Sequence, residues 1–266
     1  MLLKASLMER QIPPAYRRFL EVTLLLVRRD FRGRYKHTRV GIAWSVLNPL
    51  MFLGIFYLVF YVVIGIKIPR YASFIFIGIL SWTWLQSSLM QAVTSISSNP
   101  GLVSQPGFPV SSLPIVATTV TLLNMLLSAP VLAAILAIEG GRLSLALISL
   151  PIPLAINFTL ILGIAYLASA TNVRFRDIEH ILPIVLQLGY YVTPIFYTVD
   201  RIPGRWRWLF DINPVFVMID AYRGILLDGQ LPDPGRLFGA AVVAIFLLVI
   251  GSVLFARARH RFLESI

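Results

Sequence analysis

Five long stretches of this sequence lack Asp, Glu, Lys, Arg and His altogether. They cover residues 40–66, 71–138, 143–173, 181–199 and 237–256. About 20 consecutive apolar residues are enough for a helix to cross a bilayer, whereas a soluble core helix keeps a polar face. The stretches therefore predict an integral membrane protein. Because none of them holds an ionisable side chain, they offer no proton relay or ion pathway to drive transport.

Other absences narrow the function further. The chain has no cysteine, which excludes disulfides, zinc–thiolate sites and thiol chemistry, and we expect no metal site. No G-x-x-x-x-G-K-[ST] sequence occurs, so the chain has no phosphate-binding loop of its own. If this protein moves a substrate, its energy must come from a partner chain.

The apolar stretches predict an all-α protein with six transmembrane helices. The stretch 71–138 is too long for one span and breaks at 97–112, where SSNPGLVSQPGFPVSS is rich in Ser, Pro and Gly. The resulting spans cover about 43–66, 73–96, 112–138, 143–170, 181–199 and 237–256. Nearly all residues lie in spans or short connections, so we expect a single transmembrane domain over residues 1–266.

The distribution of positive charge predicts the orientation. The formal net charge is +11, and ten of the 23 Lys and Arg residues precede Val40. This enrichment before the first span is typical of a cytoplasmic face and not of a nucleic-acid-binding protein. With six spans both termini share a side, so both are predicted to be cytoplasmic, with residues 1–42 forming a cytoplasmic segment.

Two segments outside the spans have helical patterns of their own. From Tyr16 to Tyr35, apolar and charged side chains fall on different faces of a basic amphipathic helix, which suits the membrane interface; a plain topology anchor is the alternative. In the external segment 200–236, the apolar runs 206–210 and 214–221 are too short to span. They predict a re-entrant helical hairpin before the last span, the alternative being an external loop with interfacial aromatic anchors.

Three sequence blocks resemble one family. The first block precedes and enters the first span and reads RRDFRGRYKHTRVGIAWSVLNPL. The second joins the fourth and fifth spans and reads ATNVRFRDIEHILPIVLQLGYYVTPIFY. The third precedes the last span and reads INPVFVMIDAYRGILLDG. In this order they resemble the type-2 permeases of ABC transporters that export polysaccharides. The resemblance implies a homodimer in the bacterial cytoplasmic (inner) membrane. It also implies two copies of a separate ATPase, which bind ATP and Mg²⁺, and a substrate carried on a polyprenyl-pyrophosphate lipid, as in O-antigen export for lipopolysaccharide biosynthesis.

The resemblance also assigns the contact with the ATPase. The uncharged turn-rich loop 97–109 corresponds to the coupling element, and 172–180 is a second cytoplasmic turn. The charged residues of that turn could instead pair among themselves and have a structural role, although surface ion pairs contribute little to stability. The predicted coupling residues are Asn99, Gly101, Leu102, Val103, Arg174, Arg176 and Asp177.

Aromatic residues suggest the path of the substrate. A sugar chain needs a wet, uncharged conduit in which aromatic faces stack on sugar CH groups and hydroxyls form hydrogen bonds. Lipid-facing or interfacial belts are the alternative. The predicted conduit residues are Tyr57, Phe60, Tyr61, Trp82, Trp84, Tyr190, Tyr191, Phe196 and Tyr197.

Cations near the ends of the spans could bind the lipid pyrophosphate, because Arg grips phosphate in a bidentate manner. Arg34, Lys36 and Arg39 precede the first span, and Arg205 and Arg207 lie on the outer side. Positive-inside anchoring accounts for part of the first group.

Three other kinds of function remain open. The first is export of another substrate: teichoic-acid export uses the same architecture, and a related permease could export a drug or a small lipid. An integral-membrane enzyme of polyprenyl-linked glycan synthesis would need clustered cytoplasmic carboxylates, usually with a metal, and the cytoplasmic loops beyond the N-terminal segment offer only Asp177 and Glu179. A purely structural membrane protein is the third. We therefore expect a transporter permease and not an enzyme.

Overall fold

The computed structural model describes residues 13–36, 41, 43–141 and 144–262. Over these residues the chain is helical and has no strand. The α-helices are α2 (Pro14–Tyr35), α3 (Ala43–Phe56), α4 (Tyr71–Thr94), α5 (Pro100–Val103), α6 (Ser112–Leu127), α7 (Ala129–Ile138), α8 (Pro151–Arg174), α9 (Ile178–Val192), α10 (Gly204–Ile212), α11 (Pro214–Arg223) and α12 (Pro234–Phe262). Short π- or 3₁₀-helical turns are η1 (Tyr57–Val63), η2 (Leu145–Ser149), η3 (Val199–Arg201) and η4 (Gly224–Asp228).

Five helical segments of the described chain are long and apolar enough to cross a membrane. They cover Ala43–Val63, Tyr71–Thr94, Ser112–Ile138, Leu145–Arg174 and Pro234–Ala258. The fifth predicted span, 181–199, is instead the 15-residue helix α9, and the predicted end at 199 is wrong. Thr193 precedes Pro194 and is extended, with ψ 135°, because the proline ring disfavours helical backbone at the residue before it.

The third predicted span, 112–138, is helical but interrupted. Helix α6 ends at Leu127 and α7 begins at Ala129, with Pro130 in the first turn of α7. Proline has no N–H and its ring clashes with the preceding turn, so a continuous helix is disfavoured here. The hydroxyl of Ser128 at the break donates to the backbone oxygen of Ser45, 3.2 Å away. This hydrogen bond connects the break between α6 and α7 to the first span.

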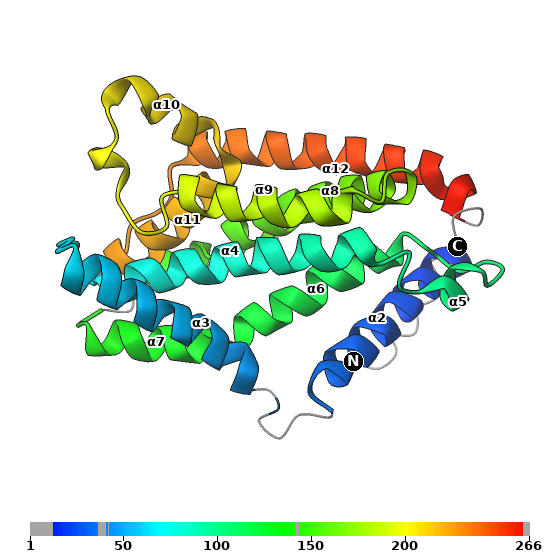
Figure 1. The fold of residues 1–266 in the computed structure, drawn as a ribbon, viewed down its shortest axis with the longest axis horizontal. Coiled ribbons are helices and arrows are strands. Elements are labelled where there is room, and N and C mark those ends of the chain that lie inside the picture. The colour runs from blue at the N-terminus through cyan, green and yellow to red at the C-terminus, as the bar shows by residue number, and fades with distance from the viewer. Residues whose placement is uncertain (1–12, 37–40, 42, 142–143, 263–266) are drawn as a thin grey trace.

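Helix α4 occupies the centre of the molecule (Figure 1). It packs against α3, α6, α8, α9 and α11. Hydroxyl groups that would be costly in hydrocarbon are satisfied inside this packing: the Ser88 hydroxyl lies 2.6 Å from that of Thr121, and the Ser169 hydroxyl donates to the backbone oxygen of Ala92 at 2.7 Å. The second span is therefore the core around which the others assemble.

Helices α8 and α12 make the most extensive helix–helix contact. Glycine allows it, because a Cβ at Gly163 would lie 2.6 Å from the backbone nitrogen of Leu248. A Cβ at Gly251 would lie 2.5 Å from the backbone oxygen of Gly163. Small residues let membrane helices approach closely enough for dispersion forces to hold them.

The helix predicted at 16–35 is confirmed as α2, with its placement relative to a membrane untested. Thr23, Leu26 and Val27 are buried, and α2 packs on α6. Leu24 and Leu25 on the outer face are 58% and 63% exposed. Helices α2 and α5 and the end of α12 lie at one end of the molecule, whereas α10 and α11 lie at the other (Figure 1). The coupling loop and the predicted external segment are therefore at opposite ends.

The two apolar runs of the segment 200–236 form separate helices, α10 and α11. They are joined at Asn213, whose side chain accepts from the backbone N–H groups of Val215 and Phe216. Helix α11 is largely buried against α4, α8 and α12, whereas α10 is exposed. An extended loop is thus excluded for these residues, and re-entry into a bilayer stays a prediction.

Candidate functional site

Aromatic side chains of the first span and of the segment after α9 meet in one cluster. The rings of Tyr57 and Tyr61 in η1 stack with centroids 4.7 Å apart. Phe60, on the same turn, stacks on Phe196 at 5.0 Å with nearly parallel planes. Phe60 thus faces the segment that follows α9, whereas the rings of Tyr57 and Tyr61 lie 6.2 and 5.7 Å from that of Tyr71 at the start of α4.

Helices α4 and α9 complete this aromatic cluster. The ring of Trp82 lies 5.8 Å from that of Tyr190. The two helices come this close because residue 189 is glycine: a Cβ on Gly189 would lie 2.9 Å from the Trp82 ring. The Tyr71 hydroxyl donates to the backbone oxygen of Phe196 at 2.9 Å. The aromatic cluster therefore packs α9 and the turn that follows it against α4.

Exposure divides the nine predicted conduit residues into two groups. The side chains at most 5% exposed are Trp82, Trp84 and Phe196. The half-buried or exposed ones are Tyr57, Phe60, Tyr61, Tyr190, Tyr191 and Tyr197. The first group belongs to the core of the chain, and in this conformation only the second group could meet a substrate.

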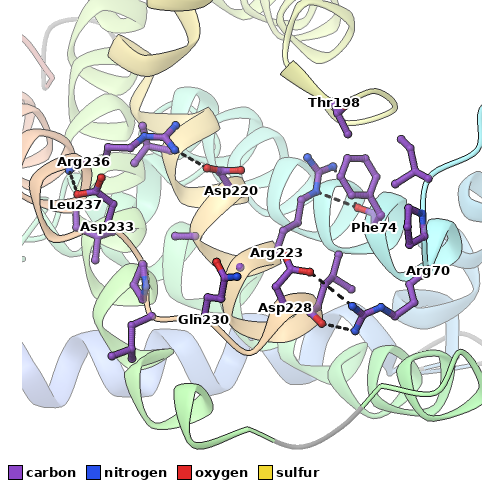
Figure 2. Close-up of a pocket in the computed structure, with 18 residues that line it drawn as sticks. Arg70, Phe74, Thr198, Asp220, Arg223, Asp228, Gln230, Asp233, Arg236 and Leu237 are labelled. Carbon is purple, nitrogen blue, oxygen red and sulfur yellow. Dashed lines mark hydrogen bonds and ion pairs between the residues drawn. The ribbon is translucent and has the colours of Figure 1, made fainter. Parts of the chain in front are cut away.

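A pocket of about 670 Å³ lies near the aromatic cluster, and we call it the charged pocket (Figure 2). It is enclosed by the turn before α4, by α11 and η4, and by the start of α12. Its charged lining residues are Arg70, Asp220, Arg223, Asp228, Asp233 and Arg236. None of them was among the predicted site residues, although Arg223 inside the apolar block VFVMIDAYRGILL was a visible signal.

Arg223 is buried and holds the turn after α9 against α4. Its guanidinium donates to the backbone oxygens of Pro194 and Ile195, each at 2.8 Å, and twice to that of Phe74 at 3.2 Å. It also lies 3.5 Å from the centroid of the Phe74 ring. A fork of five N–H donors suits this role, because one side chain can donate at once to a carbonyl in the first turn of α4 and to two carbonyls of the non-helical segment after α9.

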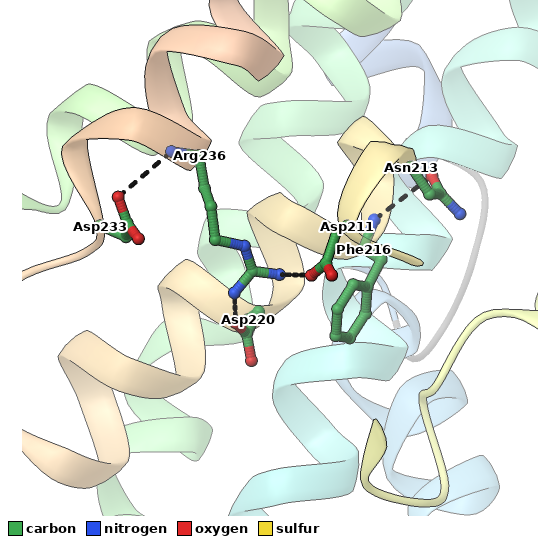
Figure 3. Close-up of polar contacts among 6 residues, drawn as sticks. All are labelled: Asp211, Asn213, Phe216, Asp220, Asp233 and Arg236. Carbon is green, nitrogen blue, oxygen red and sulfur yellow. Dashed lines mark hydrogen bonds and ion pairs between the residues drawn. The ribbon is translucent and has the colours of Figure 1, made fainter. Parts of the chain in front are cut away.

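Arg236 ties α10, α11 and α12 together (Figure 3). Its guanidinium is 2.6 Å from the Asp220 carboxylate on α11 and 3.4 Å from that of Asp211 on α10. Asp233 accepts from the backbone N–H groups of Gly235 and Arg236 and so caps α12. The helical pair α10–α11 is therefore anchored to the start of the last span.

The predicted pyrophosphate-binding cations have different surroundings. Arg34 near the end of α2 is exposed and donates to the Gln91 side chain. Lys36 follows it and is exposed, whereas Arg39 lies outside the described residues. On α10, Arg205 lies over the Trp206 ring at 5.6 Å. Arg207 donates to two backbone oxygens of its own loop, so its guanidinium already has a structural role.

Arg34 also lines a smaller cavity of about 320 Å³ between α3, α4 and α6, which the sequence did not reveal. Apart from Arg34, its polar lining consists of uncharged groups. These residues are Ser45, Asn48, Thr83, Ser87, Thr121, Asn124 and Ser128. A cavity with one guanidinium and no carboxylate favours an anion, in contrast to the charged pocket.

The predicted coupling loop contains the short helix α5. The Asn99 side chain donates to the backbone oxygen of Ser95 at 2.9 Å. Val103 is buried in a cluster that includes Leu26 and Val27 of α2, whereas Gly101 is exposed. The buried side chain of Val103 thus holds the loop against α2. Leu102 is half-buried, between buried Val103 and exposed Gly101.

The turn 172–180, predicted to be the second cytoplasmic turn, is connected to α4 by Asn172. Its side chain donates to the backbone oxygen of Val93 at 3.0 Å and accepts from the backbone N–H of Glu179 at 3.2 Å. The predicted coupling residues of this turn are exposed: Arg174, Arg176 and Asp177. Arg174 lies over the Phe175 ring at 5.1 Å. The described residues contain no group of His, Cys, Asp and Glu arranged to hold a metal ion.

Comparison with known proteins assigns the family. Residues 21–227 match the family model described as "ABC-2 type transporter". The chain is 30% identical to the O-antigen export system permease protein RfbA of Myxococcus xanthus over 243 residues, covering 91% of this chain and 94% of that protein. It is also 30% identical to RfbA of Klebsiella pneumoniae, covering 92% and 94%. The polysialic acid transport protein KpsM of Escherichia coli is 24% identical over 246 residues, covering 89% and 93%.

The family model covers most of the sequence, and these alignments run almost from end to end, so the chain belongs to the ABC-2 type transporter family, as a permease and not an enzyme.

Proposed function

We propose that this protein is the membrane subunit of an ABC exporter for an O-antigen-like polysaccharide. The observation that carries the proposal is its nearly end-to-end similarity to permeases named for O-antigen export. The uncharged spans and the aromatic cluster support it, because a sliding glycan needs weak contacts without ion pairs. The substrate is carried on polyprenyl pyrophosphate across the cytoplasmic membrane, and both termini are cytoplasmic.

Energy comes from two copies of a separate ATPase, which bind ATP and Mg²⁺. The loop around α5 makes the main contact, with Gly101 exposed and Val103 fixing the loop against α2. Arg174, Arg176 and Asp177 form the second contact on their exposed turn. Movement of the ATPase reaches α4 and α9 through Asn172, which bonds to the end of one helix and the start of the other.

The active unit is a dimer of this chain, and its conduit runs between the protomers. The first span supports this arrangement, because Leu58, Tyr61 and Val62 are 56%, 40% and 65% exposed. Helix α9 has a similar exposed face, which includes Leu188 and Tyr191. In the dimer the aromatic cluster lines the glycan path.

The lipid pyrophosphate binds first at the cytoplasmic end, where Arg34 lies at the polar cavity between α3, α4 and α6. Lys36, which follows α2, adds positive charge there. Helix α2 lies along the interface, because its charged residues would be expensive in hydrocarbon. At the other end α10 and α11 form a re-entrant hairpin, and Arg205 meets the phosphate as the lipid leaves.

The proposal is tested by reconstituting the permease with its ATPase in lipid vesicles that contain polyprenyl-pyrophosphate-linked glycan. We expect glycan to appear on the side opposite the ATPase only when ATP and Mg²⁺ are present. Gly101→Asp in the exposed coupling loop should uncouple ATP hydrolysis from export, whereas Gly101→Ala, which adds an uncharged side chain at the same open position, serves as a control. Glycan transfer without ATP, or ATPase activity unaffected by the permease, would contradict the proposal.

A further inference from the structure

The charged pocket has a balanced set of charges. Its lining contains three arginines and three aspartates, and no Lys, Glu or His. At neutral pH these six side chains sum to zero formal charge. The lining of the Arg34 cavity, by contrast, contains one arginine and no Asp or Glu. The two cavities are therefore built for ligands of different charge.

The arginines of the charged pocket are already engaged. Arg70 lies 3.6 Å from Asp228 and donates to the backbone oxygen of Leu227. Arg236 forms an ion pair with Asp220 at 2.6 Å, and Arg223 donates hydrogen bonds to three backbone carbonyl oxygens. A phosphate group entering this pocket would have to displace these partners and would meet three carboxylates. The pocket thus disfavours an anion.

The same side chains leave polar edges open to a neutral ligand. The Asp228 and Asp220 side chains are 53% and 44% exposed, and those of Arg70 and Arg236 are 29% and 33% exposed. The pocket therefore offers both donors and acceptors, and Gln230 adds an amide that has both. Vicinal sugar hydroxyls, which donate and accept at once, match this pattern.

The walls and the size fit a sugar as well. Ile68, Pro69, Leu231 and Pro232 supply apolar surfaces for the CH groups of a ring. The volume of about 670 Å³ lies within the range of roughly 300–1,000 Å³ that is usual for small-ligand sites. The backbone also favours a fixed site, since Arg70 has φ +51°, a left-handed conformation that its contacts with Leu227 and Asp228 help to maintain.

The position of the pocket connects it to the aromatic cluster. Arg223, which lines the pocket, holds the backbone of Ile195, and the next residue, Phe196, belongs to the cluster. We propose that the charged pocket binds a neutral sugar residue of the glycan at the outer mouth of the conduit. This inference rests on the proposed function and adds a substrate class: uncharged sugar units, as opposed to pyrophosphate or acidic sugars.

Binding to the purified complex of permease and ATPase in lipid nanodiscs tests the proposal. The probes are neutral trisaccharides of mannose, rhamnose or N-acetylglucosamine, with inorganic pyrophosphate and sialic acid for comparison, and saturation-transfer NMR and calorimetry are the readouts. At least one neutral trisaccharide should bind, and the two anions should not compete with it. Absence of binding by all three neutral probes, or displacement by pyrophosphate, would overturn the proposal.

Two variants locate the site, and a third controls for charge. Asp228→Asn and Gln230→Ala alter exposed side chains and should each weaken trisaccharide binding about tenfold, as expected for one or two lost hydrogen bonds. Asp200→Asn makes the same chemical change as Asp228→Asn on an exposed residue outside the pocket and should leave binding unchanged. Equal effects of Asp228→Asn and Asp200→Asn would refute the location. Normal ATP-driven export without neutral-sugar binding would remove this inference and leave the proposed function intact, whereas absence of export would remove the proposed function itself.

Discussion

The first and second spans look alike in sequence but have opposite surroundings. Both are uncharged helices, of 21 and 24 residues. In its most apolar 18-residue stretch, Ala43–Val63 has 11% of its residues buried, whereas Tyr71–Thr94 has 78%. The exposed span is also the more apolar of the two. The difference shows that a membrane helix can carry more polar groups when protein surrounds it, because neighbouring helices satisfy them.

Serines illustrate this difference. Ser73 and Ser88 of α4 are fully buried. Ser73 meets the Glu139 carboxylate, and Ser88 meets the hydroxyl of Thr121. The first span has one serine, Ser45, and then continues with apolar and aromatic residues as far as Ile66, apart from Asn48. Its exposed face must therefore be covered by lipid, a second protomer or the glycan.

Replacing one isoleucine in each of the two spans should give the largest difference in the free energy of unfolding. Ile79 in α4 is 1% exposed and Ile55 in α3 is 57% exposed. Ile79→Ala removes buried contacts and leaves a cavity, so we expect it to cost about 2 kcal/mol or more of the free energy of unfolding. Ile55→Ala should cost about 0.5 kcal/mol or less. Thermal unfolding of the detergent-solubilised protein measures both, and equal losses would remove the distinction between the spans.

Two glycines give a second contrast. A Cβ at Gly78 in α4 would lie 3.0 Å from both the Arg223 guanidinium and the Ile195 side chain, whereas Gly54 in α3 has nothing within 4 Å. Gly78→Val should therefore cost about 1–3 kcal/mol through overpacking. Gly54→Val should be neutral or slightly stabilising, because valine has the higher helix propensity. Unfolding midpoints that fall equally for both variants would contradict the packing described for α4.

Changes on the aromatic face of the first span should affect transport more than stability. Replacing Tyr57 and Tyr61 together by Ala removes two stacking surfaces, each worth about 0.5–1.5 kcal/mol. We expect glycan export to slow roughly tenfold while the ATPase still binds. Phe60→Asp should be more severe, because a charge in the conduit would hold or repel the polymer. Export rates in vesicles test this, and normal export by the double variant would show that these rings do not line the path.

The start of the second span should show the smallest effect. The Glu139 carboxylate accepts hydrogen bonds from the backbone N–H groups of Ala72 and Ser73, at 3.1 and 3.0 Å, and so caps α4 from the end of α7. Glu139→Ala should cost about 1 kcal/mol, and Glu139→Gln less, since an amide oxygen still accepts. Hydrogen exchange at the first turn of α4 measures the loss. Unchanged protection in Glu139→Ala would indicate that the cap contributes nothing.

The sequence allowed most helices to be predicted, because uncharged runs and turn-forming residues mark their limits. The break at Ser128 was missed although Pro130 marks it, since hydropathy alone treats 112–138 as continuous. The end of α9 was missed for the same reason at Pro194. In both cases local backbone chemistry outweighed the apolar pattern.

The site was less predictable than the fold. The aromatic residues of the first span and of the α9 region could be listed from the sequence, but the burial of Trp82, Trp84 and Phe196 depends on how the helices pack around α4. The charged pocket joins residues from 70 to 236 in the sequence, and only tertiary packing brings them together. A pattern within one segment has no information about such contacts.

Photo-cross-linking from the exposed face of the first span tests the central claim most directly. The native chain has no cysteine, so a single thiol can be placed at will. Tyr61→Cys and Val249→Cys replace side chains that are 40% and 54% exposed, on η1 and α12 respectively. Each would carry a thiol-linked photoprobe and be illuminated during ATP-driven export. We expect a glycan adduct at Tyr61→Cys that requires ATP, and only lipid adducts at Val249→Cys. Lipid adducts alone at both positions would contradict a conduit along the first span.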